Sequence, residues 1–293
     1  MKAVVNRIIP FSSVDGPGNR TAIFLQGCNI NCKYCHNPET RGMCKNCGVC
    51  ADNCPAGALA LEAGRVHFDG TKCVQCDTCI HVCPYDSSPR TEELTPQEVF
   101  ERVRKQMPYI RGISVSGGEC MLQPEFLTEL FSLAKEEGLS TLIDSNGTIP
   151  FQEYPKLVEV TDGVMLDIKA FDCEEHKNVT GTGNETVLEN AVWLAEHKKL
   201  YEVRAVIVPG LYDTENSIRK MGEFLAPYLA VQEFRIKVIA YRPMGVRREF
   251  VSVSFLLSPH GPGAQTLDIW LGSKYLYLCA ILSSQVSLPC FLF

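Results

Sequence analysis

The sequence lacks a surplus of basic side chains. It holds 28 Lys and Arg against 34 Asp and Glu, which gives a net charge of −6. Proteins that bind nucleic acid usually carry a clustered basic surplus, so we expect no nucleic-acid partner. The first residues, MKAVVNRIIPF, also lack a long apolar run and a small-residue cleavage site. We therefore expect a cytoplasmic protein with no membrane association.

Cysteine, in contrast, is abundant. There are 15 cysteines, and 11 of them lie between Cys28 and Cys83. An odd count argues against a disulfide framework, and clustering at two-residue gaps favours metal ligation. The remaining four are isolated in the sequence, and each is expected to be a small buried hydrophobic residue rather than a ligand. They are Cys120, Cys173, Cys279 and Cys290.

Two stretches repeat the pattern C-x2-C-x2-C-x3-C-P. They are CKNCGVCADNCP at 44–55 and CVQCDTCIHVCP at 73–84. This is the signature of bacterial two-cluster ferredoxins, in which the fourth cysteine of each run binds the other cluster. A pair of zinc knuckles is the alternative, but zinc sites usually combine two C-x2-C pairs or add histidine. We assign one [4Fe–4S] cluster to Cys44, Cys47, Cys50 and Cys83, and a second to Cys73, Cys76, Cys79 and Cys54.

A third cysteine group is one ligand short. Residues 28–36 read CNINCKYCH, which places Cys28, Cys32 and Cys35 at a C-x3-C-x2-C spacing before His36. Iron–sulfur cubanes usually take four protein ligands. The two repeated runs use all eight of their own cysteines. Either another residue completes this site, or its fourth position is left open for a reactant.

Outside the cysteine runs, strand and helix signals alternate. Repeated βα units predict a parallel sheet, and about six of them suggest an α/β fold with a partial barrel. The sequence TPQE at 95–98 predicts a capping box, and apolar stripes predict further helices near 126–134, 187–195 and 218–225. The predicted strands are 3–9, 21–25, 113–116, 140–144, 163–168, 201–208 and 233–239.

Polar residues gather where these strands end, which is where parallel α/β folds place their chemistry. Each group alone also has a plain structural explanation, such as a turn or an exposed ion pair. Their recurrence on successive strands favours a site. The residues are Ser116, Gly117, Gly118 and Glu119, then Asp144, Ser145 and Asn146, then Asp167 and Lys169, and finally Arg204.

These motifs resemble a known family. The C-x3-C-x2-C group after a first strand, with Gly-Gly-Glu at a later strand end, is similar to radical S-adenosylmethionine (SAM) enzymes. The segment DGPGNRTAIFLQGC at 15–28, followed by CKYCHN, resembles the glycyl radical enzyme activating enzymes of the pyruvate formate-lyase activase family. The doubled cysteine run, with VSGGE, DSNG and GVMLDIK, looks most like the YjjW-type activases.

The resemblance implies a partial (β/α)6 radical SAM barrel with a bacterial-ferredoxin-like 2[4Fe–4S] insert. The barrel would comprise 1–36 and 92–250, and the insert 37–91. Three [4Fe–4S] clusters are implied, and the one held by Cys28, Cys32 and Cys35 would bind SAM at its open iron. This oxidoreductase would cleave SAM to methionine and a 5′-deoxyadenosyl radical, which abstracts hydrogen from a glycine of a partner glycyl radical enzyme. Reduced flavodoxin or ferredoxin would supply the electron.

The resemblance also implies residue roles. Tyr34, Cys35 and His36 would lie near the adenine, and Gly118 and Glu119 would meet the methionine ammonium. Asp167, Ile168 and Lys169 would line the ribose and carboxylate side. A monovalent cation is implied near Asp144, Ser145, Met165 and Asp167, and Gly117 and Arg204 complete the expected cofactor-binding set. No side chain is expected to act as a catalytic residue, because the radical forms at bound SAM.

Two features depart from the family pattern. Arg242 stands where the family often has a histidine that touches SAM. In 251–293 only Asp268 and Lys274 are charged, so we hypothesise that the reading frame changes near residue 250. Two other functions stay open: a radical SAM enzyme acting on a small molecule, and an iron–sulfur electron-transfer protein. The Gly-Gly-Glu and Asp-Ile-Lys strand ends argue against the second.

Overall fold

The computed structural model describes residues 1–208, 210–241, 266–272 and 275–278. The chain divides into two compact units. The first unit comprises Met1–Asn29 and Asn37–Leu139, and the second comprises Ile30–His36 and Ser140–Phe293. The loop from 28 to 36 is therefore shared, because Cys28 belongs to the first unit while Cys32 and Cys35 belong to the second.

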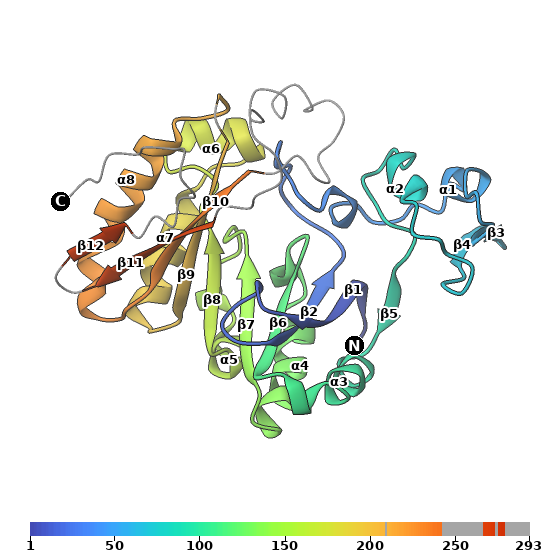
Figure 1. The fold of residues 1–293 in the computed structure, drawn as a ribbon, viewed down its shortest axis with the longest axis horizontal. Coiled ribbons are helices and arrows are strands. Elements are labelled where there is room, and N and C mark those ends of the chain that lie inside the picture. The colour runs from blue at the N-terminus through green and yellow to red at the C-terminus, as the bar shows by residue number, and fades with distance from the viewer. Residues whose placement is uncertain (209, 242–265, 273–274, 279–293) are drawn as a thin grey trace, which may run out of the picture. The chain divides into compact units, whose positions relative to one another are not determined.

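The first unit is built on four strands in the order β5-β1-β2-β6 (Figure 1). Strands β2 (Arg20–Leu25) and β6 (Gly112–Gly117) are parallel, with Leu25 opposite Gly117. Strand β1 (Ala3–Ser12) is antiparallel to both β2 and β5 (Glu92–Leu94). The predicted strand at 3–9 therefore exists, but it does not join the parallel part of the sheet. A short connection explains this, since β1 and β2 are joined without a crossover helix.

The two longer helices of the first unit match the segments predicted from the sequence. Helix α3 (Pro96–Arg104) starts with the predicted capping box, in which Thr95 and Glu98 bond reciprocally. Helix α4 (Pro124–Glu136) buries its apolar stripe, including Phe126, Leu130 and Phe131. The 3₁₀ turns of this unit are η1 (Pro38–Thr40), η2 (Met107–Tyr109) and η3 (Cys120–Leu122).

The cysteine-rich part of the first unit has little regular structure. It contains two one-turn helices, α1 (Val49–Asp52) and α2 (Thr78–His81), and one hairpin, β3 (Leu59–Glu62) with β4 (Arg65–Phe68). Its buried core consists of Cys50, Leu59 and Cys79. So small a core contributes little hydrophobic stabilisation, and such modules usually depend on metal or disulfide bonds.

The second unit has strands in the order β7-β8-β9-β10-β11-β12. Strands β7 (Ser140–Ser145), β8 (Gly163–Asp167), β9 (Leu200–Ile207) and β10 (Arg235–Ala240) are parallel. Strands β11 (Thr266–Gly272) and β12 (Tyr275–Leu278) continue antiparallel. Its helices and turns are η4 (Phe151–Glu153), α5 (Pro155–Val160), α6 (Cys173–Thr180), α7 (Glu185–Glu196), α8 (Thr214–Leu225) and η5 (Ala226–Ala230).

The fold confirms the prediction of an α/β protein with a largely parallel sheet. Each predicted strand and each predicted helical stripe corresponds to an element. Arg242 and most of 251–293 lie outside the described residues, so the hypothesis about the reading frame falls outside them as well. Among the described residues, no helix is long and apolar enough to cross a bilayer.

Candidate functional site

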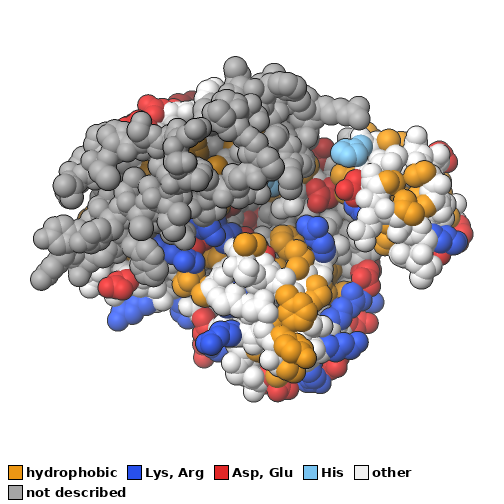
Figure 2. All heavy atoms as spheres, in the orientation of Figure 1, with side chains coloured by type: hydrophobic (Ala, Val, Ile, Leu, Met, Phe, Trp, Pro, Cys, Tyr) orange, Lys and Arg blue, Asp and Glu red, His pale blue; other side chains and the backbone are white. Residues whose placement is uncertain are grey.

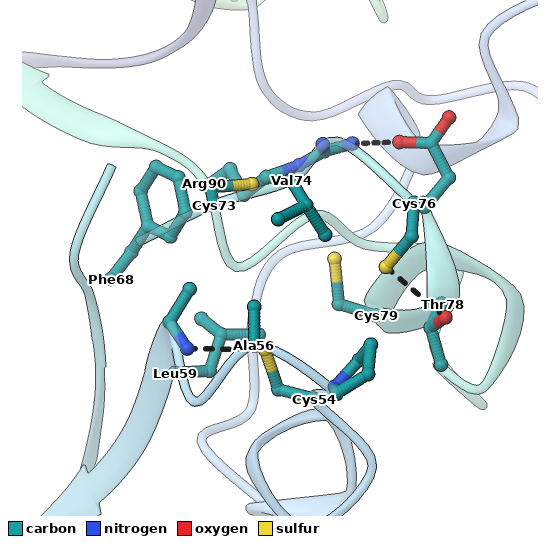
Figure 3. A pocket seen from close by; sticks show the side chains of 13 residues that line it. Cys54, Ala56, Leu59, Phe68, Cys73, Val74, Cys76, Thr78, Cys79 and Arg90 are labelled. Carbon is teal, nitrogen blue, oxygen red and sulfur yellow. Dashed lines mark hydrogen bonds and ion pairs between the residues drawn. The ribbon is translucent and has the colours of Figure 1, made fainter. Parts of the chain in front are cut away.

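The eight cysteines of the two repeated runs line two cavities. One cavity, of about 310 Å³ including space open to solvent, is lined by Cys44, Cys47, Cys50 and Cys83. The other, of about 320 Å³ on the same measure, is lined by Cys54, Cys73, Cys76 and Cys79 (Figure 3). Each cavity thus combines three cysteines of one run with the last cysteine of the other, the crossed arrangement assigned from the spacing.

The two runs fold alike around their cysteines. The second residue after the first cysteine of each run, Asn46 or Gln75, has a positive φ of 54° or 56°. This left-handed turn aims its backbone N–H at the preceding sulfur, at 3.4 Å in both runs. Each run then enters its one-turn helix through a second left-handed residue, Gly48 or Asp77. N–H groups aimed at sulfur stabilise a thiolate, so this backbone is suited to metal-bound cysteine.

Burial and hydrogen bonding act oppositely on these thiols. Burial raises the pKa of Cys50 to about 11 and also raises the pKa of Cys79. Hydrogen bonds from the Thr78 side chain and backbone lower the pKa of the exposed Cys76. Within the described part of the chain, no three His, Cys, Asp or Glu side chains lie close enough to hold a single metal ion.

The strand ends of the first unit are shaped by close backbone approach. Glu119 donates its N–H to the Gly27 carbonyl at 2.7 Å, and Gly118 donates to Leu25 at 3.0 Å. A Cβ on Gly118 would lie 2.1 Å from the Gly27 oxygen, and one on Gly117, whose φ is +128°, would lie 2.1 Å from the Leu25 oxygen. Only glycine fits at either position, so the Gly-Gly pair fixes the backbone that precedes Cys28.

Hydrogen bonds also hold the backbone segment that leads to Cys28. Gln26, which is 3% exposed, donates to the carbonyls of Glu39 and Gly42 and accepts from the Asn6 side chain at 2.8 Å. The Cys28 N–H donates to Arg41 at 2.9 Å. The Glu119 side chain is 1% exposed, and one carboxylate oxygen accepts the Met121 N–H at 2.9 Å.

In the second unit, the loop carrying Cys32 and Cys35 is fixed to helix α6. Asn31 donates to Thr180 at 2.8 Å and Lys33 donates to Val179 at 2.9 Å. Tyr34 lies in a buried cluster, and burial raises its pKa well above the usual value.

Two aromatic contacts complete this loop. The Lys169 ammonium lies 5.9 Å from the centre of the Tyr34 ring, and the Tyr34 hydroxyl donates to the Lys169 carbonyl at 3.4 Å. His36 stacks on Tyr241 with ring centres 5.8 Å apart. The structure thus brings Tyr34 and Lys169 into contact.

Charged side chains converge on the strand ends of the second unit. Arg204 donates to Asp144 at 2.8 Å, to Glu202 at 2.6 Å and to the Met165 sulfur at 2.9 Å. Burial opposes its charge, but the combined attraction of the carboxylates of Asp144, Glu202 and Asp167 outweighs burial, so the pKa of Arg204 is raised. Glu202, fully buried, also pairs with Arg235 at 2.6 Å.

The other expected residues of this unit lie on β7, β8 and the segment after β8. Lys169 pairs with Asp167 at 2.6 Å, while Ile168 is buried and donates its N–H to the Arg204 carbonyl at 3.0 Å. Ser145 is buried and accepts the Gly147 N–H at 3.0 Å. Arg204 therefore already supplies positive charge at Asp144 and Met165, two of the four residues expected around a cation.

Three residues escaped the sequence analysis. Glu202 is a fully buried carboxylate within the predicted strand YEVRAVIV. A charged residue among apolar ones could have indicated a buried ion pair. Arg20 is 1% exposed and donates to Ser114 and to the Ile113 carbonyl. His176 is fully buried in α6 and bonds the Thr182 carbonyl at 2.8 Å, which no local pattern predicts.

Comparison with known proteins identifies the family of this chain. Residues 22–225 match the model of the radical SAM superfamily. The chain is 31% identical to the choline trimethylamine-lyase activating enzyme of Oleidesulfovibrio alaskensis, covering 84% of this chain and 85% of that protein. It is 35% identical to the pyruvate formate-lyase-activating enzyme of Streptococcus mutans, covering 83% and 78%.

Among solved structures, Streptococcus suis SuiB bound to precursor peptide SuiA matches with a TM-score of 0.50 and 11% identity. The match covers 79% of this chain and 43% of SuiB, and it supports the fold alone. The chain belongs to the radical SAM superfamily and, within it, to the glycyl radical enzyme activating enzymes. These enzymes generate a 5′-deoxyadenosyl radical from SAM, and the radical abstracts hydrogen from a glycine of a partner enzyme.

Proposed function

We propose that this activating enzyme carries three [4Fe–4S] clusters, two of them in a ferredoxin-like insert spanning 37–91, as in YjjW-type activases. The third would be held by Cys28, Cys32 and Cys35 in a radical SAM domain formed by 1–36 and 92–250. Residues 251–293 would be a tail of anomalous composition, and our hypothesis is that the reading frame changes near residue 250.

The crossed lining of the two cavities carries the proposal for the insert. Each iron of a cubane takes one protein ligand, so four cysteines around a cavity of a few hundred Å³ fit a cluster. A structural zinc ion would require its ligands to converge on one atom, and the described cysteines do not converge in that way. The N–H groups aimed at Cys44 and Cys73 match the charge of bound thiolates.

The chain's own residues would bind and orient SAM. A reduced cluster supplies one electron to cleave the sulfonium, and the protein's part is positioning and exclusion of water. The Gly117–Gly118 backbone would approach the methionine group closely, and the Glu119 carboxylate would accept from its ammonium. Tyr34, Cys35 and His36 would lie beside the adenine, and Asp167, Ile168 and Lys169 beside the ribose and carboxylate.

Arg204 would hold Asp144 and Met165 in place within the second unit, because it bonds both. A monovalent cation at Asp144, Ser145, Met165 and Asp167 would have to share the first and third of these residues with the guanidinium.

The partner would be a glycyl radical enzyme, and the electron donor a reduced flavodoxin or ferredoxin. The insert exposes Val49, Leu61, Val74 and Tyr85, each at least 37% accessible. Figure 2 shows hydrophobic side chains gathered on the visible face of the insert. Short-lived electron-transfer encounters use small surfaces of this kind, so the insert is the expected docking point for the donor.

The crossed assignment is tested by iron content. Cys83→Ala should remove the cluster of the first run, a loss of about four irons per chain, while leaving the cluster of the second run intact. Cys54→Ala should do the opposite. Cys173→Ala, which changes a half-buried cysteine outside both cavities, is the matched control and should keep the full iron content. Loss of the cluster of the second run in Cys83→Ala would contradict the crossed assignment.

The activity is tested anaerobically. The reduced protein should form 5′-deoxyadenosine from SAM, and adding its glycyl radical enzyme should produce the glycyl doublet in electron paramagnetic resonance. A full rate of SAM cleavage by the Cys44→Ala, Cys73→Ala double variant with reduced flavodoxin would show that the insert is not on the electron path. Formation of 5′-deoxyadenosine with no glycyl doublet after the glycyl radical enzyme is added would favour a small-molecule substrate.

A further inference from the structure

Arg90 lies against one of the two cysteine cavities. It lines the cavity of Cys54, Cys73, Cys76 and Cys79, where its side chain lies beside that of Cys73 (Figure 3). It also pairs with Asp77 at 2.7 Å, and Asp77 belongs to the same cysteine run. On its other side, Arg90 lines an open hollow together with Arg7 and Glu39. The guanidinium is thus fixed next to the sulfur atoms.

The charges of this pair do not cancel at the cysteines. The Arg90 side chain is 22% exposed, whereas the Asp77 side chain is 53% exposed, so water screens the carboxylate more. A net positive potential therefore acts on this cavity.

The first run has no such pair at the matching positions. The two runs are offset by the same number of residues throughout, so Gly48 corresponds to Asp77 and Leu61 to Arg90. These two matching residues are also neighbours, since a Cβ on Gly48 would lie 2.9 Å from a Leu61 methyl. An apolar contact thus stands where the second run has an ion pair. Lys45 lines the first cavity, but its side chain is exposed.

We propose that Arg90 is a positioning residue that sets the reduction potential of the cluster held by Cys54, Cys73, Cys76 and Cys79, making it easier to reduce than its neighbour. One-electron reduction adds one negative charge to a cluster, and a nearby cation stabilises that charge. This inference rests on the proposed two-cluster insert. The two insert clusters would then have different reduction potentials, although their cysteine runs are similar.

The test is a redox titration of the full-length protein, followed by electron paramagnetic resonance. Changing Cys28, Cys32 and Cys35 to Ala first removes the third cluster from the spectra. Arg90→Gln should then shift the reduction equilibrium of one insert cluster about tenfold toward the oxidised form, which is 59 mV for one electron. Cys54→Ala should abolish the same signal, which identifies the cluster that shifted.

Asp77→Asn should shift the same cluster in the opposite direction, because it removes the opposing carboxylate. Asparagine also accepts the left-handed backbone at this position, so the loop keeps its shape. Arg90→Lys keeps the positive charge, so its shift should be smaller than that of Arg90→Gln. Arg102→Gln, which breaks the Arg102–Glu92 pair on the surface of the same unit, should leave both potentials unchanged.

The outcomes separate the two proposals. If the variant with Cys28, Cys32 and Cys35 changed to Ala binds no iron, the two-cluster proposal is wrong. If both clusters load but Arg90→Gln moves neither potential, or moves both equally, the role of Arg90 is wrong. If Arg90→Gln fails to load its cluster, the opposite shift expected of Asp77→Asn decides the question.

Discussion

The strand ends of the two units are built on different principles. In the first unit, Gly117 and Gly118 let the backbone approach Leu25 and Gly27 to distances that no side chain permits. In the second, Arg204 binds Asp144, Glu202 and Met165 through side chains alone. The first arrangement is steric and tolerates almost no change. The second is electrostatic, so the stability lost on replacing Arg204 should depend on the charge and shape of the new side chain.

The largest loss of activity is expected for a substitution at Gly118, where a side chain would clash with the backbone. In Gly118→Ala, the new Cβ would meet the backbone oxygen of Gly27 at 2.1 Å and that of Thr40 at 2.8 Å. Backbone cannot move aside as a flexible side chain can, so the segment leading to Cys28 must shift. A displacement of about 1 Å at a reacting centre can cost about 100-fold in rate. We expect at least that loss in 5′-deoxyadenosine formation, with iron content measured in parallel.

A matched glycine shows whether the clash is the cause. Gly222 lies in helix α8, has no atom within 4 Å of its would-be Cβ and has no positive φ. Gly222→Ala should keep full activity and stabilise the helix by about 0.5–1 kcal/mol. Equal activity of the two alanine variants would contradict the steric account of the first unit.

A graded response is expected in the second unit. Arg204→Met leaves the partly buried Asp144 and the fully buried Glu202 without this guanidinium, and breaking a buried pair costs about 3–5 kcal/mol. Arg204→Lys keeps the charge but loses the fork that reaches two carboxylates, so its loss should be smaller. Both tryptophans, Trp193 and Trp270, belong to this unit. Denaturant unfolding followed by tryptophan fluorescence therefore measures its free energy of unfolding.

The control is an exposed pair on the same unit. Arg219 and Glu223 form an ion pair at 2.7 Å with both side chains exposed. Such helix pairs contribute about 0.3–0.5 kcal/mol, so Arg219→Met should change little. If Arg204→Met were no more destabilising than Arg219→Met, the Arg204 network would not hold these strand ends together.

Features that depend on residues close together in the sequence were predicted, and features that depend on residues far apart were not. The strands, the capping box and the crossed cysteine cavities follow from local spacing, because the repeat fixes which sulfurs can meet. The pairing of Arg90 with Asp77 and that of Arg20 with Ser114, 94 residues away, depend on tertiary approach and leave no local signal. The antiparallel β1 was also missed, since periodicity shows that a strand exists but not its direction.

The smallest expected effect concerns pH and also belongs to the second unit. His176 is fully buried, and its Nδ1–H donates to the Thr182 carbonyl, which leaves Nε2 with no partner among the described residues. Burial lowers its pKa below the ordinary 6.5. Both folded and unfolded states are therefore neutral above about pH 6.5. As the pH falls further the unfolded state takes up the proton first, so stability is lost until the folded pKa is reached.

The loss should not exceed about 1.4 kcal/mol per pH unit below pH 6.5. His176→Asn removes the titrating group while keeping a donor for Thr182, so its free energy of unfolding should depend less on pH between about 6.5 and 5. His197→Asn changes an exposed histidine and should follow the wild-type profile. Parallel pH profiles for the wild type and His176→Asn would show that the buried imidazole does not contribute, and the acid sensitivity of the second unit would then have to come from its carboxylates.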